Sequence, residues 1–153
     1  MLVVPDDLAD EELLRRRLKP AQYDLATKKA FPSAFICANG PPDEVSVDRV
    51  EYRDLDTSLH GLAGFGCCTL CVSKAQEITG LRPESRPLDN NPAHAVILVP
   101  KDSFTNGESP RDSSFFVPLA EAADMESLPN AQEYRAAMKE KDRQRKMLAP
   151  RPA

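Results

Sequence analysis

Prolines occur throughout this chain, and they limit how far any regular element can run. Fourteen prolines stand against only six glycines in 153 residues. Because proline lacks a backbone N–H and clashes with the preceding helical turn, it interrupts helices and central strands. The sequence therefore favours short elements over a bundle of long helices. Since 41% of the residues are hydrophobic, close to the globular norm, one folded domain with its own core is expected.

Four segments predict the strands of a small sheet: 45–52, 64–72, 95–99 and 115–117. In the first of them, Val45 and Val47 lie two residues apart, as on a half-buried strand. The phase then slips to Val50 and Tyr52, which indicates a bulge or two half-elements. The fold class predicted is α+β, a small mixed β-sheet with short flanking helices and a basic C-terminal helix.

The segment 7–18 is predicted to be the first helix. Its carboxylates fall in the first turn and Arg15, Arg16 and Arg17 in the last, which complements the helix dipole. Pro20 would end it.

Two further helices carry capping signals. The tetrapeptide 73–76, which begins with Ser and ends with Gln, predicts a helix over 74–79, and Gly80 is a natural residue to end it. The tetrapeptide 130–133, which begins with Asn and ends with Glu, predicts a helix that runs to about Met147.

The end of the chain is basic, although the chain as a whole is acidic. Residues 139–153 carry six basic and two acidic side chains, a net charge of +4, against −4 for the whole sequence. We therefore predict an α+β domain over 1–128 and a C-terminal helix with a basic tail over 129–153. Such a tail suits an acidic protein partner and could also reach nucleic acid. The plainer interpretation is a solvated helix end. The candidate partner-binding residues are Arg143, Arg145 and Lys146.

The segment 87–99 contains the strongest candidate for chemistry. A polar, Asn-rich turn runs directly into an apolar strand, and His94 stands at the junction. Side chains at the mouth of a strand often carry function, and histidine serves as a general acid or base. The alternative is a histidine that only satisfies backbone groups of the loop.

Asp48 and Arg49 form a charged pair inside a β-prone run. Such a pair is usually the solvent face of a sheet. If that strand lies beside 95–99, Arg49 could hold a phosphate or carboxylate while Asp48 orients the His94 ring. These three residues are the candidate catalytic set.

Four cysteines leave three interpretations open. Cys68 and Cys71 form a CxxC pair, and Cys37 with His60 would complete a zinc-ligand set. Positions 68 and 71 would, however, face opposite sides of a strand, and a redox pair normally begins a helix. We therefore expect Cys67, Cys68 and Cys71 to be buried structural thiols without metal.

Three short motifs occur in order: Ser-Ala-Phe at 33–35, Ser-Val-Asp at 46–48 and Asn-Pro-Ala-His-Ala at 91–95. This order resembles a pattern of small uncharacterised bacterial proteins. The resemblance implies no activity, but it favours 32–99 as one unit with Asp48 and His94 as its polar landmarks.

Familiar enzyme signatures are missing from the sequence, including the GxSxG elbow, the Walker loop, GxGxxG and HExxH. No apolar run is long enough to cross a bilayer and no secretory signal begins the chain, so a cytoplasmic protein without membrane contact is expected. The function expected first is a non-enzymatic interaction module of a bacterial multi-protein system, without a cofactor. The alternative is a small enzyme that acts on a phosphate- or ribosyl-containing substrate through His94, Asp48 and Arg49.

Overall fold

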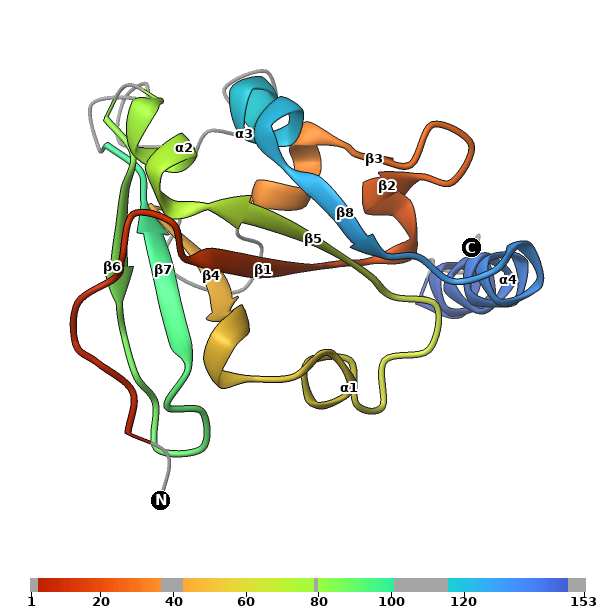
Figure 1. Ribbon diagram of the computed structural model, residues 1–153. Coiled ribbons are helices and arrows are strands. Elements are labelled where there is room, and N and C mark those ends of the chain that lie inside the picture. The colour runs from red at the N-terminus through yellow and green to blue at the C-terminus, as the bar shows by residue number, and fades with distance from the viewer. Residues whose placement is uncertain (1–2, 37–42, 79, 101–115, 149–153) are drawn as a thin grey trace.

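A six-stranded antiparallel sheet forms the centre of the protein, in a computed structural model that describes residues 3–36, 43–78, 80–100 and 116–148 (Figure 1). The strand order is β6-β7-β4-β1-β5-β8, and every pairing between these strands is antiparallel. The strands are β1 (Leu13–Leu18), β4 (Glu44–Arg49), β5 (Gly66–Cys71), β6 (Arg82–Ser85), β7 (His94–Leu98) and β8 (Asp124–Ser127). The α+β class predicted from the sequence is confirmed.

The remaining elements are short, apart from the last helix. A hairpin of β2 (Tyr23–Asp24) and β3 (Lys29–Ala30) forms a second, two-stranded sheet. The 3₁₀ helices are η1 (Pro20–Gln22), η2 (Pro32–Phe35) and η3 (Val50–Tyr52). The α-helices are α1 (Leu55–Ser58), α2 (Val72–Glu77), α3 (Val117–Ala122) and α4 (Ala131–Leu148).

The hydrophobic core lies on one face of the sheet. There α2, α3, η2 and the β2–β3 hairpin cover the strands, whereas α1 lies on the other side (Figure 1). Phe35 of η2 and Phe116 just before α3 are both 1% exposed, and their ring centroids are 6.5 Å apart. Alternate residues of a strand face opposite sides, so Val45 and Val47 point into this core and Ser46 and Asp48 point away from it.

The segment predicted as the first helix is a strand, and that prediction was wrong. Residues Leu13–Leu18 form β1, which pairs with β5 along its whole length. Leu14 and Leu18 are fully buried in the core. Their spacing of four residues suits a helix face as well as a strand face, and pairing with two neighbouring strands overrides the local preference.

The edges of the sheet also differ from the prediction. Segment 115–117 is not a strand where it is described, because Phe116 precedes α3 and Val117 begins it. Residue 115 lies outside the described residues. The edge strands are β6 and β8, which the sequence pattern did not reveal. Pro83 lies within β6, and an edge strand tolerates a proline that a central strand would not.

The helix α2 begins at Val72 and has no side-chain cap, so the capping box predicted at 73–76 does not form. Backbone carbonyls take its place: the N–H groups of Val72 and Ser73 donate to the oxygens of Glu12 and Asp10. Gly80 follows the helix with a φ of +83°, a conformation that glycine adopts readily.

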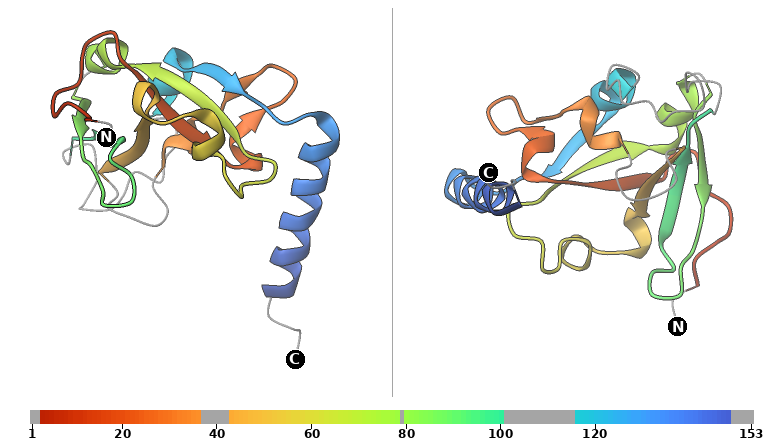
Figure 2. Two further views of the ribbon diagram at one scale, coloured as in Figure 1. Left: turned by 60° about the horizontal axis from the view of Figure 1, so that its bottom comes forward. Right: turned by 180° about the vertical axis from the view of Figure 1, so that it is seen from behind.

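The helix α4 forms as predicted. The Glu133 N–H donates to Asn130 Oδ1 at 2.8 Å, the cap expected from the sequence. The helix projects from the body of the protein, and none of its residues is buried (Figure 2). Its first turns contact the body: the ring centroids of Tyr134 and Tyr23 are 5.7 Å apart.

Candidate functional site

A pocket opens where β1 and β4 separate. These strands pair only at Leu14 with Arg49 and at Arg15 with Asp48, although β1 pairs with β5 over six positions. The pocket has a volume of about 320 Å³. Its lining residues are Arg15, Arg16, Arg17, Ser46, Val47, Asp48, Arg53, Leu88, Asn90, Asn91 and His94.

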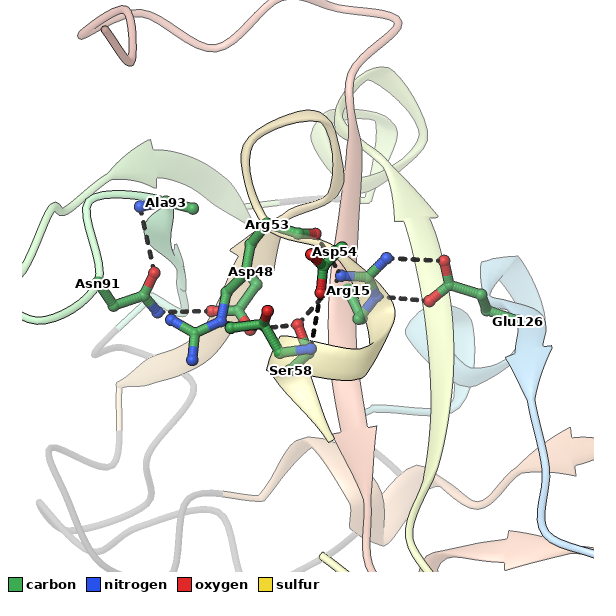
Figure 3. Close-up of polar contacts among 9 residues, drawn as sticks. Arg15, Asp48, Arg53, Asp54, Ser58, Asn91, Ala93 and Glu126 are labelled. Atoms are coloured by element: carbon green, nitrogen blue, oxygen red, sulfur yellow. Dashed lines mark hydrogen bonds and ion pairs between the residues drawn. The ribbon is translucent and has the colours of Figure 1, made fainter. Parts of the chain in front are cut away.

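Asp48 is the one carboxylate among these lining residues, and each of its oxygens accepts a hydrogen bond (Figure 3). Asn91 Nδ2 donates to Oδ1 at 2.8 Å, and Ser58 Oγ donates to Oδ2 at 3.0 Å. The Nε of Arg53 lies 3.6 Å from the same Oδ2. Since Asp48 is only 8% exposed, these partners compensate a charge that is largely removed from water.

Arg15 connects this carboxylate to the far edge of the sheet. Its Nε and Nη2 donate to the two oxygens of Glu126 on β8, at 2.5 and 2.9 Å (Figure 3). Its Nη1 donates to Ser58 Oγ at 3.0 Å and to the Arg53 carbonyl at 2.7 Å. The hydrogen bonds that Arg15 donates to Glu126 raise the pKa of Arg15. Ser58 therefore accepts from Arg15 and donates to Asp48, which joins the two groups into one network.

The helix α1 places Ser58 in that network. Asp54 caps this helix through a hydrogen bond from the Thr57 N–H to its Oδ1, at 2.7 Å. Hydrogen bonding from Thr57, through its side chain first and then its N–H, lowers the pKa of the Asp54 carboxyl. A single helical turn with a charged cap thus holds a buried hydroxyl over the sheet.

Three further arginines line the pocket. Arg16 crosses the gap between the strands, donating from Nη1 to the Ser46 carbonyl at 2.8 Å. The Arg17 side chain is exposed and forms no hydrogen bond or ion pair with any residue that the structure describes. The Nε of Arg53 is buried and has no hydrogen-bond partner there either. An unsatisfied buried donor costs about 1–3 kcal/mol and calls for an explanation.

His94 lies directly opposite Asp48 in the pairing of β7 with β4. Its Nδ1 is 2.7 Å from the Arg86 carbonyl, which can only accept, so Nδ1 carries the proton. Nε2 is then the ring nitrogen left for a ligand. No hydrogen bond joins the side chains of these two described residues, so Asp48 does not orient the ring as the sequence hypothesis required.

The structure thus brings Asp48 and His94 together and separates Arg49 from them. Arg49 points to the other face of the sheet, is 1% exposed, and donates to both oxygens of Glu12. Sequence reasoning missed Arg15, Arg16, Arg17 and Arg53. Three consecutive arginines between Leu14 and Leu18 were a usable signal, but it was assigned to the end of a helix.

The tail residues lie elsewhere. Arg143 and Arg145 are exposed on α4 and pair with Glu140 and Asp142, three residues before each of them. Lys146 is exposed as well. None of these side chains lines the pocket.

Cys67 and Cys68 are buried on β5, as predicted. Burial raises the pKa of both thiols to about 12. Cys71 differs from them, because it is only partly buried and a hydrogen bond with the Ser73 hydroxyl lowers its pKa. Cys37 lies outside the described residues. Within the described part of the chain, no three His, Cys, Asp or Glu side chains are grouped so as to hold a metal ion.

Comparison with known proteins adds no family to this description. No family model matches the chain, and neither a curated protein nor a solved structure matches it. Among the described helices, none has the length and apolar character required to cross a membrane.

Proposed function

We propose that this protein binds a small anionic ligand in the pocket between β1 and β4. The observation that carries the proposal is a pair of arginines in the lining: Arg17 is exposed, and the buried Nε of Arg53 has no hydrogen-bond partner among the described residues. Gathering like charges is unfavourable unless an opposite charge compensates them. A bound anion would supply that compensation.

Arg17 and Arg53 are the proposed anion-binding residues. Arg15 already donates to both oxygens of Glu126, so we assign it a structural role in the lining of the pocket. The Arg17 side chain forms no hydrogen bond or ion pair with a described residue, and the Nε of Arg53 lies 3.6 Å from the Asp48 carboxylate, beyond hydrogen-bond distance. Guanidinium groups bind carboxylates and phosphates through paired N–H donors. With its proton on Nδ1, the neutral His94 ring would offer Nε2 as an acceptor for a hydroxyl group of the ligand.

This proposal retains the ligand class expected for a small enzyme, namely a phosphate- or ribosyl-containing molecule. It gives the anion-binding role to Arg17 and Arg53 in place of Arg49, whose guanidinium is bound by Glu12. Asp48 and His94 keep their place in the site.

A thermal-shift titration tests the proposal. Sodium phosphate is added to the full chain against sodium chloride at equal ionic strength, so that general screening cancels. We expect phosphate to raise the Tm of the wild-type protein, since a ligand that binds only the folded state stabilises it.

The variants Arg17→Gln and Arg53→Gln should lose most of this shift, whereas Arg135→Gln should keep it, because Arg135 is exposed on α4, away from the pocket. A phosphate shift that is absent from the wild type, or that is equal in all four proteins, would overturn the proposal.

A second function is favoured by a separate observation, the exposure of every residue of α4 after Met138. We propose that α4 is an arm through which the protein contacts a protein partner, as expected for an interaction module. Its basic end, with Arg143, Arg145 and Lys146, would face acidic groups on that partner.

Chemical crosslinking at two salt concentrations tests the arm. The wild type is compared with the triple variant Arg143→Gln, Arg145→Gln, Lys146→Gln, whose fold should be unaffected because all three side chains are exposed. We expect a partner that crosslinks to the wild type at low salt to be lost in the variant. Equal crosslinking of both proteins would contradict an electrostatic role for the tail.

A further inference from the structure

We infer that the ligand of this pocket is a small anion that also carries a hydroxyl group, and that this hydroxyl donates a hydrogen bond to His94 Nε2. The inference rests on the proposed function and narrows it. Arg17 lies on β1 and Arg53 follows η3, so two segments supply cationic donors to the lining, whereas His94 at the start of β7 supplies an acceptor. A ligand that fits both kinds of group needs an anionic group and a separate donor.

The tautomer of His94 is fixed by a residue that does not line the pocket. Nδ1 lies 2.7 Å from the carbonyl oxygen of Arg86, which can only accept, so the lone pair of the neutral ring is on Nε2. The ring is partly buried, and no described residue donates to Nε2. A ligand that fills the pocket displaces water from this nitrogen and therefore has to replace the hydrogen bond that the water made.

A simple anion cannot supply that hydrogen bond. The oxygens of a carboxylate are acceptors only, and they pair with the N–H groups of guanidinium side chains. Placed against His94 Nε2, such an oxygen would bring two acceptors together with no proton between them. A hydroxyl group removes the conflict, because its O–H donates to Nε2 while the anionic group stays with Arg17 and Arg53.

The other neutral polar side chains of the lining do not impose this requirement. Ser46 and Asn90 each contain a donor and an acceptor, so they adapt to either kind of ligand group. Asn91 is already engaged, since its Nδ2 donates to Asp48 and its Oδ1 accepts from the Ala93 N–H (Figure 3). The selection for a hydroxyl group therefore falls to His94.

The size of the pocket keeps the two ligand groups close together. Its volume of about 320 Å³ stands at the lower end of the ~300–1,000 Å³ that is usual for small-molecule sites. Arg17, Arg53 and His94 all line this one pocket, so the hydroxyl group must lie within a few bonds of the anionic group. Small hydroxycarboxylates and small polyol phosphates share this chemistry.

Isothermal titration calorimetry with two matched pairs of probes tests the inference on the full chain. The pairs are lactate with propionate and glycerol 3-phosphate with propyl phosphate, at constant ionic strength and about pH 8, where an ordinary imidazole is neutral. Within each pair the anionic group is the same and only hydroxyl groups differ. Comparison of the two pairs distinguishes a carboxylate ligand from a phosphate ligand.

We expect the hydroxylated member of at least one pair to bind about tenfold more tightly than its deoxy partner, a difference of about 1.4 kcal/mol. His94→Ala should abolish this preference, because it weakens only the hydroxylated probe. His60→Ala should keep the preference, since His60 is exposed and lies outside the lining. Arg17→Gln should weaken both members of the pair equally, because it acts on the anionic group.

The contrary results separate this inference from the proposed function. If both deoxy probes bind the wild type as tightly as their hydroxylated partners, the hydroxyl group is wrong while an anion pocket stands. If the preference persists in His94→Ala, the assignment of the acceptor to His94 is wrong. If none of the four probes binds but phosphate still raises the Tm, only the inference fails. If phosphate has no effect either, both fail.

Discussion

Glu12 and Arg49 form a bidentate ion pair that is buried, with side-chain exposures of 4% and 1%. The Nε and Nη2 of Arg49 lie 3.0 and 2.8 Å from different oxygens of Glu12. The same guanidinium donates to the carbonyls of Pro5 and Asp7 and stacks over the Tyr52 ring, 4.7 Å from its centroid. Arg49 therefore fastens the N-terminal segment to β4.

Removing one member of this pair should destabilise the protein. Arg49→Ala leaves the Glu12 carboxylate buried without its cation, so we expect a loss of about 3–5 kcal/mol in the free energy of unfolding. Urea unfolding followed by circular dichroism measures it. The folded fraction should still bind phosphate, since Arg49 does not line the pocket. A stable Arg49→Ala protein that no longer binds phosphate would show that Arg49 belongs to the site after all.

His94→Ala should weaken ligand binding but cost little stability, the reverse of what is expected for Arg49→Ala. The ring is partly exposed and makes one hydrogen bond, from Nδ1 to the Arg86 carbonyl, so the loss of stability should stay below about 1.5 kcal/mol. Ligand binding should weaken strongly, because Nε2 is lost from the pocket. His60→Ala is the matched control, since His60 is exposed and lies outside the pocket lining. Calorimetry and urea unfolding on the same samples decide the outcome, and a strongly destabilised variant with unchanged affinity would assign His94 a structural role.

The thiols should differ in reactivity with pH. The pKa of Cys71 is lowered by the Ser73 hydroxyl, so its reactive thiolate is populated at a lower pH than in the unfolded chain. The pKa values of Cys67 and Cys68 are raised to about 12, so both stay protonated at neutral pH.

Iodoacetamide labelling of a Cys37→Ser variant, read by peptide mass spectrometry at about pH 7.5, should therefore modify Cys71 first. Ser73→Ala should slow that reaction. Equal labelling of all three thiols would mean that β5 opens readily or that the assigned environments are wrong.

We expect Gly64 to determine how closely the start of α4 packs against the body of the protein. Its φ is +78°, and a Cβ added there would lie 2.3 Å from the Cβ of Ala137. Gly64→Ala should therefore displace the start of α4, at a cost of about 1–3 kcal/mol for the strained backbone alone. Gly61→Ala is the control, because Gly61 has a similar φ of +73° but open space around it.

Hydrogen exchange measures the effect. In the wild type, protection should be highest near Tyr134 and Met138 and be lost beyond Lys146, since the exposed end of α4 has no packing to retain it. Gly64→Ala should remove the protection near Tyr134, and Gly61→Ala should not. Strong protection as far as Met147 in the isolated wild type would contradict this description of α4.

Local signals in the sequence predicted the parts of the fold that depend on local chemistry. The apolar runs predicted β5 and β7, and the cap at Asn130 predicted α4. The slip in the hydrophobic alternation after Val47 indicated the change from β4 to η3. The strand β1 could not be found this way, because its character depends on two partners that are distant in the sequence.

The candidate site was predicted only in part, for a related reason. Asp48 and His94 were singled out, and the pairing of β4 with β7 places them opposite each other. Arg49 was grouped with them because it is adjacent in sequence, yet neighbouring residues of a strand face opposite sides. Arg53 gave no signal, since its position depends on how η3 and α1 fold back over the sheet.

The most direct test of the anion pocket is a two-dimensional amide NMR titration of the full chain with phosphate at constant ionic strength. We predict that the largest shift changes fall at residues 15–17, 46–48, 53 and 88–94, which surround the pocket, and that Arg17→Gln with Arg53→Gln abolishes them. Saturating shifts confined to α4, or no saturating shifts at all, would contradict the claim that this pocket binds an anion.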